Sequence, residues 1–155
     1  WLVHEAAGVL GHQDLLEKTA TLAVNMARAN MTGLDRDGGL IYEWFPVEDR
    51  FDTDKHWWPQ AEAMVGYFNA FQLSGEEEFA QRTMSSWEFI KEKIVDRKYG
   101  EWYWSVSRKG NPQTEKEKAG FWKCPYHNGR ACMELIRRID KTLKINQKTK
   151  YQNEK

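Results

Sequence analysis

The sequence predicts an all-α fold of stacked helical hairpins, as in an α/α barrel or solenoid. Apolar residues recur at helical spacing over five segments of the 155-residue chain. Short and long connections alternate between those segments, so all the long connections are expected to emerge at one end of the helix layer. An aromatic residue followed about one turn later by a charged residue opens every second segment, which indicates a repeating unit. An ordinary five-helix bundle is the alternative architecture.

The first two segments predict one hairpin. Residues 1–10 are apolar at helical spacing, and Gly11 then offers a stop. A second helix is predicted over about 13–31, ended by Thr32 and Gly33. Its predicted buried face consists of Leu15, Leu16, Thr19, Leu22, Ala23, Met26, Ala27 and Asn30.

The third and fourth segments predict a second hairpin. The third helix is expected to run from 58 or 59 to 73, where Ser74 and Gly75 break the chain. The fourth is expected over about 76–96. Acidic residues fill its first turn and basic residues lie near its end, which suits the helix dipole.

The fifth helix is expected to begin near Pro125 and to continue through Leu143. The chain after it, 144–155, is polar and is expected to fray. One domain is therefore expected over 1–143, followed by a polar tail.

The two long connections, 32–57 and 97–124, are predicted to form the mouth of a site. Loops of this length in a compact domain are functional or disordered, and their many aromatic residues argue against disorder. Each contains one strand-like run, Gly39–Val47 and Gly100–Ser107.

A weak internal repeat assigns the helices to two layers. An aromatic residue, three further residues, a charged residue and then alanine occur in that order from Trp1, Trp58 and Tyr126. The helices that open with this pattern are expected to line the inside of the stack, with the other two packed outside. Such repeats need neighbours to bury their core, and a ring of six hairpins needs more than twice this length.

Composition excludes several classes of partner. Lys+Arg and Asp+Glu each number 23, with no basic block, so neither nucleic-acid binding nor attraction to a membrane surface is expected. No stretch approaches the roughly 18 apolar residues of a membrane span. Cys124 and Cys132 do not make a disulfide framework, which favours a cytoplasmic location. The chain opens on Trp1 inside a predicted helix, so we expect it to be a piece of a longer protein.

The first candidate cluster lies at the start of the third helix. Pro59 is suited to the first turn of a helix and leaves Trp57 and Trp58 at its mouth. Glu62 follows one turn later on the same face as Trp58. An indole face beside a carboxylate suits a sugar, with ring C–H groups on the indole and hydroxyls on the acid. In the alternative interpretation the Trp pair is core and Glu62 pairs with an arginine.

The second candidate cluster lies at the start of the fifth helix. His127 falls in its first turn, where the positive end of the helix dipole disfavours an imidazolium ion. A neutral imidazole is what a general base needs near pH 7. Trp122 approaches from the preceding loop, and Arg130 shares the face of His127. A structural histidine is the alternative, and no His, Cys and carboxylate set has the spacing of a metal site.

Three runs of this sequence resemble the C-terminal part of the cellobiose 2-epimerases, within the N-acylglucosamine 2-epimerase superfamily. They are Lys55 to Glu62, Gly100 to Trp104, and Trp122 to Arg130. The resemblance extends from residue 1 to about 140. It implies an (α/α)6 barrel, of which this chain is an incomplete portion amounting to less than half.

The resemblance also implies a cofactor-free reaction on a β-1,4-linked disaccharide, whose reducing-end glucose becomes mannose through an enediolate. Two histidines on opposite sides of the opened sugar exchange the C2 proton, and His127 matches one of them. Trp1, Trp58, Trp122 and Glu62 match residues that bind the substrate. The second histidine belongs to the missing N-terminal half of the barrel, so the chain alone is expected to be inactive.

Other functions stay open on the sequence alone. An aldose–ketose isomerase or an N-acylglucosamine 2-epimerase of the same superfamily would share the enediol chemistry. A non-catalytic sugar-binding module would use the tryptophans without proton transfer. A glycosidase needs paired carboxylates, and Glu62 is the one strong candidate, with Glu101 a poor second.

Overall fold

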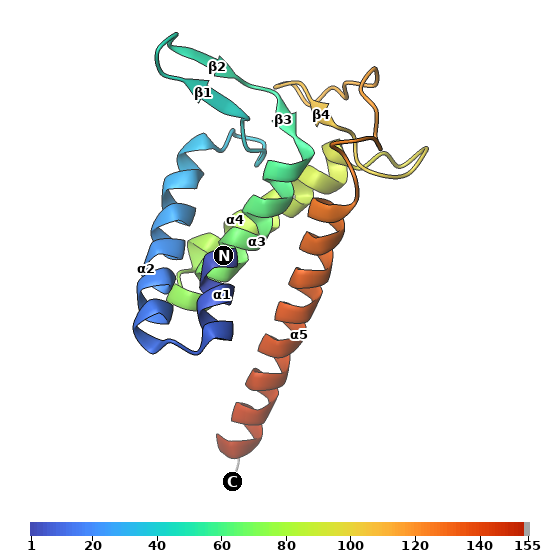
Figure 1. Cartoon of the computed structure of the whole chain (residues 1–155). Helices are drawn as coiled ribbons and strands as arrows, with labels where there is room; N and C mark the ends of the chain where they lie inside the picture. The colour runs from blue at the N-terminus through green and yellow to red at the C-terminus, as the bar shows by residue number, and fades with distance from the viewer. Residues whose placement is uncertain (154–155) are drawn as a thin grey trace.

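The computed structural model describes the backbone of residues 1–153 and the side chains of residues 1–144. Five α-helices account for most of the chain, and the predicted all-α class is confirmed (Figure 1). They are α1 (Leu2–Leu10), α2 (Gln13–Asn30), α3 (Trp57–Ser74), α4 (Glu77–Phe89) and α5 (Tyr126–Asn153). A single turn of 3-10 helix, η1 (Met31–Gly33), follows α2. No described helix is both long and apolar enough to cross a bilayer.

Glycine ends the first helix of each hairpin, as predicted. Gly11 follows α1 with φ 67°, and Gly75 follows α3 with φ 72°. Both are left-handed conformations that glycine adopts without the steric penalty of a Cβ. The chain therefore reverses over a few residues between α1 and α2 and again between α3 and α4.

The boundaries of α3 and α4 differ from the prediction at the end nearest the strands. α3 begins at Trp57, whose backbone N–H donates to the carbonyl of Trp104 (3.0 Å). α4 ends at Phe89 and continues as one turn of π-helix, η2 (Ile90–Ile94). Val95 then pairs with Trp102, which takes the chain out of the helix before the predicted end at 96. At the C-terminus, α5 continues past the predicted end at 143 as far as Asn153.

α3 is the central helix, and α2, α4 and α5 all pack against it. Its buried residues lie on every side, which is typical of a helix enclosed by protein. They are Trp57, Pro59, Gln60, Ala61, Met64, Val65, Tyr67, Asn69 and Ala70. One core cluster joins α3 to η2 and α5, and a second joins α3 to α2 and α4.

Part of the predicted buried face of α2 is exposed. Thr19 and Ala27 are buried, but Leu15, Leu22 and Met26 are not. Leu22 and Met26 border cavities between α2 and its neighbours α1 and α3, and no described residue covers them fully. Large apolar side chains are also exposed on α1 and α5: Leu2, Val3, Val9, Leu10, Met133, Ile136, Ile139 and Leu143.

The strands gather at one end of the helix layer (Figure 1). β1 (Glu43–Phe45) and β2 (Arg50–Asp52) form an antiparallel hairpin within the first long connection. β3 (Lys55–His56) pairs with β4 (Ser105–Val106) from the second. Strand structure in both predicted runs is confirmed in shortened form, and the sequence did not predict that the two connections would pair with each other.

Candidate active site

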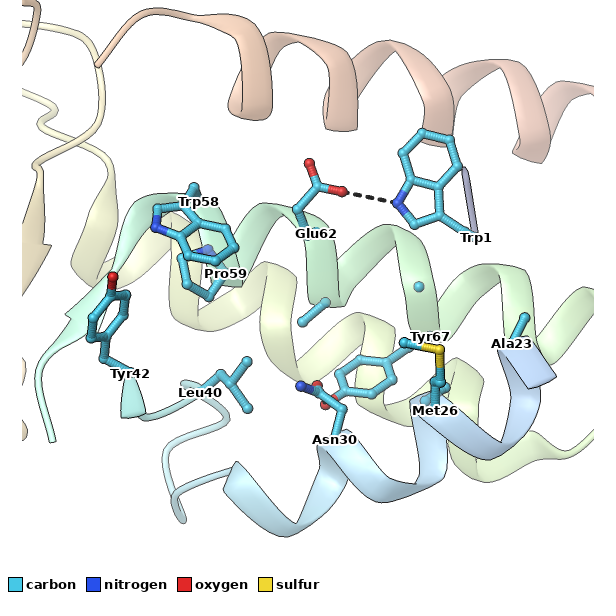
Figure 2. A pocket seen from close by; sticks show the side chains of 13 residues that line it. Trp1, Ala23, Met26, Asn30, Leu40, Tyr42, Trp58, Pro59, Glu62 and Tyr67 are labelled. Carbon is cyan, nitrogen blue, oxygen red and sulfur yellow. Dashed lines mark hydrogen bonds between the residues drawn. The ribbon is translucent and has the colours of Figure 1, made fainter. Parts of the chain in front are cut away.

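Glu62 joins the starts of three helices. Its Oε1 atom accepts hydrogen bonds from Nδ1 of His127 (2.8 Å) and from the guanidinium of Arg130, both in the first turns of α5. Its Oε2 atom accepts a hydrogen bond from Nε1 of Trp1 (2.9 Å), the residue that precedes α1 (Figure 2). The aromatic and charged repeat of the sequence therefore marks positions that meet in space.

The environment keeps Glu62 ionised. Burial by itself raises the pKa of this carboxyl, but hydrogen bonds from His127, Trp1 and Arg130 outweigh burial and hold the pKa below its ordinary value. A carboxylate can only accept a hydrogen bond, so Nδ1 of His127 carries the proton of the shared bond. In the neutral ring, Nε2 is then the nitrogen with a free lone pair.

Aromatic rings surround the imidazole of His127. The ring centroid of Trp58 lies 5.8 Å from that of His127, and the Tyr126 centroid lies 4.9 Å away. Trp58, His127 and Trp122 line one cavity of about 380 Å³. Trp122 is 78% exposed and therefore stands at its rim. The remaining lining residues are Tyr42, His56, Trp57 and Trp104.

A second cavity, of about 320 Å³, is also bordered by Trp58 (Figure 2). Trp1, Glu62 and Tyr67 line it together with residues of α2 such as Met26. Trp58 and Tyr42 border both cavities. Trp58 is thus shared by two cavities, one that His127 lines and one lined by residues of α2 and α3.

The predicted site residues therefore come together. Trp1, Glu62 and His127 are joined by hydrogen bonds, and Trp58 and Trp122 share a cavity with His127. The alternative interpretation of Glu62 as the partner of an arginine also holds, because Arg130 binds it. Within the described side chains, no three His, Cys, Asp or Glu residues gather as a metal site would require.

A family model described as N-acylglucosamine 2-epimerase matches residues 1–131. The chain belongs to the N-acylglucosamine 2-epimerase family. It is 46% identical over 136 residues to a cellobiose 2-epimerase of Bacteroides fragilis, a match that covers 88% of this chain and 35% of the relative. It is 45% identical over 139 residues to a cellobiose 2-epimerase of Ruminococcus albus, with 89% and 35% covered.

Solved structures of the family share this fold. A sugar epimerase from a ruminal bacterium superposes with a TM-score of 0.84 at 42% identity, covering 89% of this chain and 35% of that one. Cellobiose 2-epimerase from Bacillus thermoamylovorans superposes with a TM-score of 0.77 at 38% identity, with the same coverage. The chain thus spans about a third of these relatives, and the predicted fold, an incomplete portion of an (α/α)6 barrel, is confirmed.

Tyr42 and His56 also line the cavity beside His127, and neither was predicted from the sequence as a binding group. The Tyr42 ring stacks on His56 at 4.0 Å between centroids, and its edge faces Trp58 at 6.3 Å. Tyr42 lies in the predicted strand-like run 39–47, so its ring could have been assigned to the mouth. Its pairing with His56 depends on how the first connection folds back, which the local pattern does not contain.

Proposed function

We propose that this chain is the C-terminal part of a sugar 2-epimerase that interconverts glucose and mannose at the reducing end of a β-1,4-linked disaccharide such as cellobiose. The observation that carries the proposal is the hydrogen bond between Glu62 and Nδ1 of His127. It leaves Nε2 as the basic nitrogen of a ring that lines an aromatic cavity. The two free cysteines, Cys124 and Cys132, fit a cytoplasmic enzyme.

The proposed reaction begins on the opened sugar. Nε2 of His127 removes the proton on C2, the C–H electron pair forms the C1–C2 double bond, and the carbonyl electrons move to the C1 oxygen to give a cis-enediolate. A second acid on the other face returns a proton to C2 while the aldehyde re-forms. C2 is then inverted, and no electrons are gained or lost.

The aromatic residues are proposed to hold the sugar during this exchange. Pyranose C–H faces would rest on the indole of Trp58, with Trp122 reaching the second sugar from the rim. Glu62 would orient His127 through Oε1, while Oε2 keeps a lone pair for a sugar hydroxyl beside its bond from Trp1.

We expect the chain alone to be inactive, because one base cannot return a proton to the opposite face. The test joins this chain to the portions of the Bacteroides fragilis relative that lie outside the match, giving a completed enzyme. The completed enzyme should convert cellobiose to its mannose epimer, and the 155-residue chain should not. Conversion by the chain alone would contradict the proposal, as would an inactive completed enzyme that folds and binds cellobiose.

The second candidate is an aldose–ketose isomerase, in which the enediolate is protonated at C1 rather than C2. A D-mannose isomerase structure favours it, since it superposes with a TM-score of 0.63 at 27% identity. NMR of the product separates the two, because epimerisation gives a mannose anomeric signal and isomerisation gives a ketose. If neither product forms although cellobiose binds, a sugar-binding module is the remaining function.

A further inference from the structure

Glu101 has a strained backbone conformation, and the proposed mechanism assigns this residue no role. Its φ is 62°, in the left-handed region that non-glycine residues rarely adopt. Such a conformation costs about 1 kcal/mol or more and persists where its surroundings impose it. The turn around it is closed by two backbone hydrogen bonds with Asp96, from Asp96 N–H to the Glu101 carbonyl and from Gly100 N–H to the Asp96 carbonyl (both 2.9 Å).

The side chain of Glu101 ties together the residues on both sides of His127. A single oxygen, Oε1, accepts hydrogen bonds from Nζ of Lys123 (2.9 Å) and from Nδ2 of Asn128 (2.9 Å). Lys123 precedes α5, and Asn128 follows His127 within its first turn. One carboxylate therefore spans the segment 123–128, which carries the candidate base.

Lys123 depends on its contact with Glu101, because its side chain is buried. The Lys123 side chain is 0% exposed, and its ammonium also donates to the carbonyl of Lys118 (2.9 Å) and lies 5.3 Å from the Trp57 ring centroid. A buried ammonium needs a hydrogen-bonded counter-charge, and removing that charge leaves it uncompensated. Burial raises the pKa of Glu101, but hydrogen bonds led by that from Lys123 outweigh this effect and lower it, so the partner is ionised.

We propose that Glu101 is a positioning residue for His127. By fixing both ends of segment 123–128 it keeps Nδ1 of His127 within hydrogen-bonding distance of Glu62. His127 is then held twice: Glu62 on α3 binds its ring, and Glu101, in the connection after η2, holds the backbone that carries it. The inference rests on the proposed role of His127, but it can be tested without turnover.

The test is nitrogen-15 NMR of the histidine rings in the 155-residue chain. The wild type should show His127 as the Nδ1–H tautomer with a slowly exchanging ring proton. Glu101→Gly should lose that signature and give the tautomer mixture of a free imidazole. Glycine accepts a φ of 62° without strain, so a residue that served only the turn would be replaced with no effect on His127.

Asp96→Asn is the matched control. Asp96 lies in the same turn and pairs with Lys118 (2.6 Å), and among the described side chains no hydrogen bond or ion pair joins it to α5. It should destabilise the turn and leave the His127 tautomer unchanged. A wild-type His127 signature in folded Glu101→Gly, or the same loss in both variants, would overturn the proposal.

If Glu101→Gly does not fold, the double variant with Lys123→Met replaces it, since no buried ammonium is then left unpaired. In the double variant, loss of the Nδ1–H tautomer of His127 would support the proposal, and a wild-type His127 signature would overturn it. In the completed enzyme, Glu101→Gly should lower kcat about 10²-fold with little change in KM, because the base is displaced rather than the sugar. Should His127→Gln keep turnover there, the proposed function fails while the NMR result still decides the positioning role.

Discussion

The two ends of α3 are built in opposite ways. Its start carries Trp57, Trp58 and Glu62 and touches charged side chains of the long connections and of α5. Its end is a plain reversal at Gly75, where an added Cβ would meet no atom within 4 Å. The one charged residue of α3 itself, Glu62, lies at its start. Near the other end, the buried guanidinium of Arg138 comes from α5 and is bound by the neutral side chains of Asn69 and Gln72. The comparison teaches that α3 places its own charge where the chemistry is proposed.

The largest expected difference between the two ends is in catalysis. In the completed enzyme, Glu62→Gln should lower kcat by about 10² to 10⁴-fold, because an amide can present either its oxygen or its NH₂ group to His127 and no longer fixes the tautomer. Glu77→Gln, beyond the far end of α3, is the control and should leave kcat unchanged. Steady-state kinetics on cellobiose measure kcat for both variants, and equal losses would contradict the difference between the two ends of α3.

Lys55, which lies just before α3, tests the importance of charge pairing at this end of the helix through the free energy of unfolding. Its side chain is 0% exposed, and its ammonium binds Asp37 (2.6 Å) and Asp35 (3.3 Å) just before α3. Lys55→Met should lower the free energy of unfolding by about 3 kcal/mol, because the acidic partners lose a buried counter-charge. Lys91→Met, which breaks an exposed pair with Glu88, should cost about 0.5 kcal/mol. Urea unfolding of both variants measures the two losses of stability, and a loss no larger in Lys55→Met than in Lys91→Met would contradict this prediction.

Acid should weaken the start of α3 first. The pKa of Glu62 in the folded chain lies below its unfolded value of 4.5, so the unfolded state binds more protons between the two values. The stability contributed by this carboxylate is therefore present above 4.5 and is lost as the pH falls through the folded pKa. The stability gap between wild type and Glu62→Gln should shrink over that window. A gap that stays constant in acid unfolding curves would contradict the pairing of Glu62.

The smallest expected effects are at two glycines of opposite character. Gly75 has φ 72°, so Gly75→Ala should destabilise the chain by about 1 kcal/mol. Gly66 lies within α3 with no atom within 4 Å of an added Cβ, so Gly66→Ala should stabilise it by about 0.5 to 1 kcal/mol. Thermal unfolding of the pair should show shifts of opposite sign, and shifts of the same sign would refute the assignment of the turn.

Local patterns predicted most of the helices and the two clusters, around Glu62 and around His127, that come together at the candidate site. Helical spacing and the stops at Gly11 and Gly75 were sufficient for the hairpins, because these signals act over a few residues. The repeat at Trp1, Trp58 and Tyr126 predicted that the three helices opening with it line the inside of the stack. In the structure, Glu62 of α3 binds Trp1 before α1 and His127 of α5, so the starts of these three helices lie together.

What the sequence did not predict depends on contacts between distant segments. The pairing of β3 with β4 joins residues about fifty positions apart, and the Tyr42–His56 stack depends on the path of the first connection. Glu101 had been considered as an acid for sugar hydrolysis; its contacts with Lys123 and Asn128 appear once the second connection folds back on α5. Such contacts leave no periodic signal.

Deuterium exchange tests the proton transfer to His127 most directly. Cellobiose incubated with the completed enzyme in D₂O should gain deuterium at C2 of its reducing sugar, because a base that removes the C2 proton exchanges it with solvent. His127→Gln should abolish this incorporation while the protein stays folded and still binds cellobiose. Deuterium entering C2 at an undiminished rate in that variant would contradict the account.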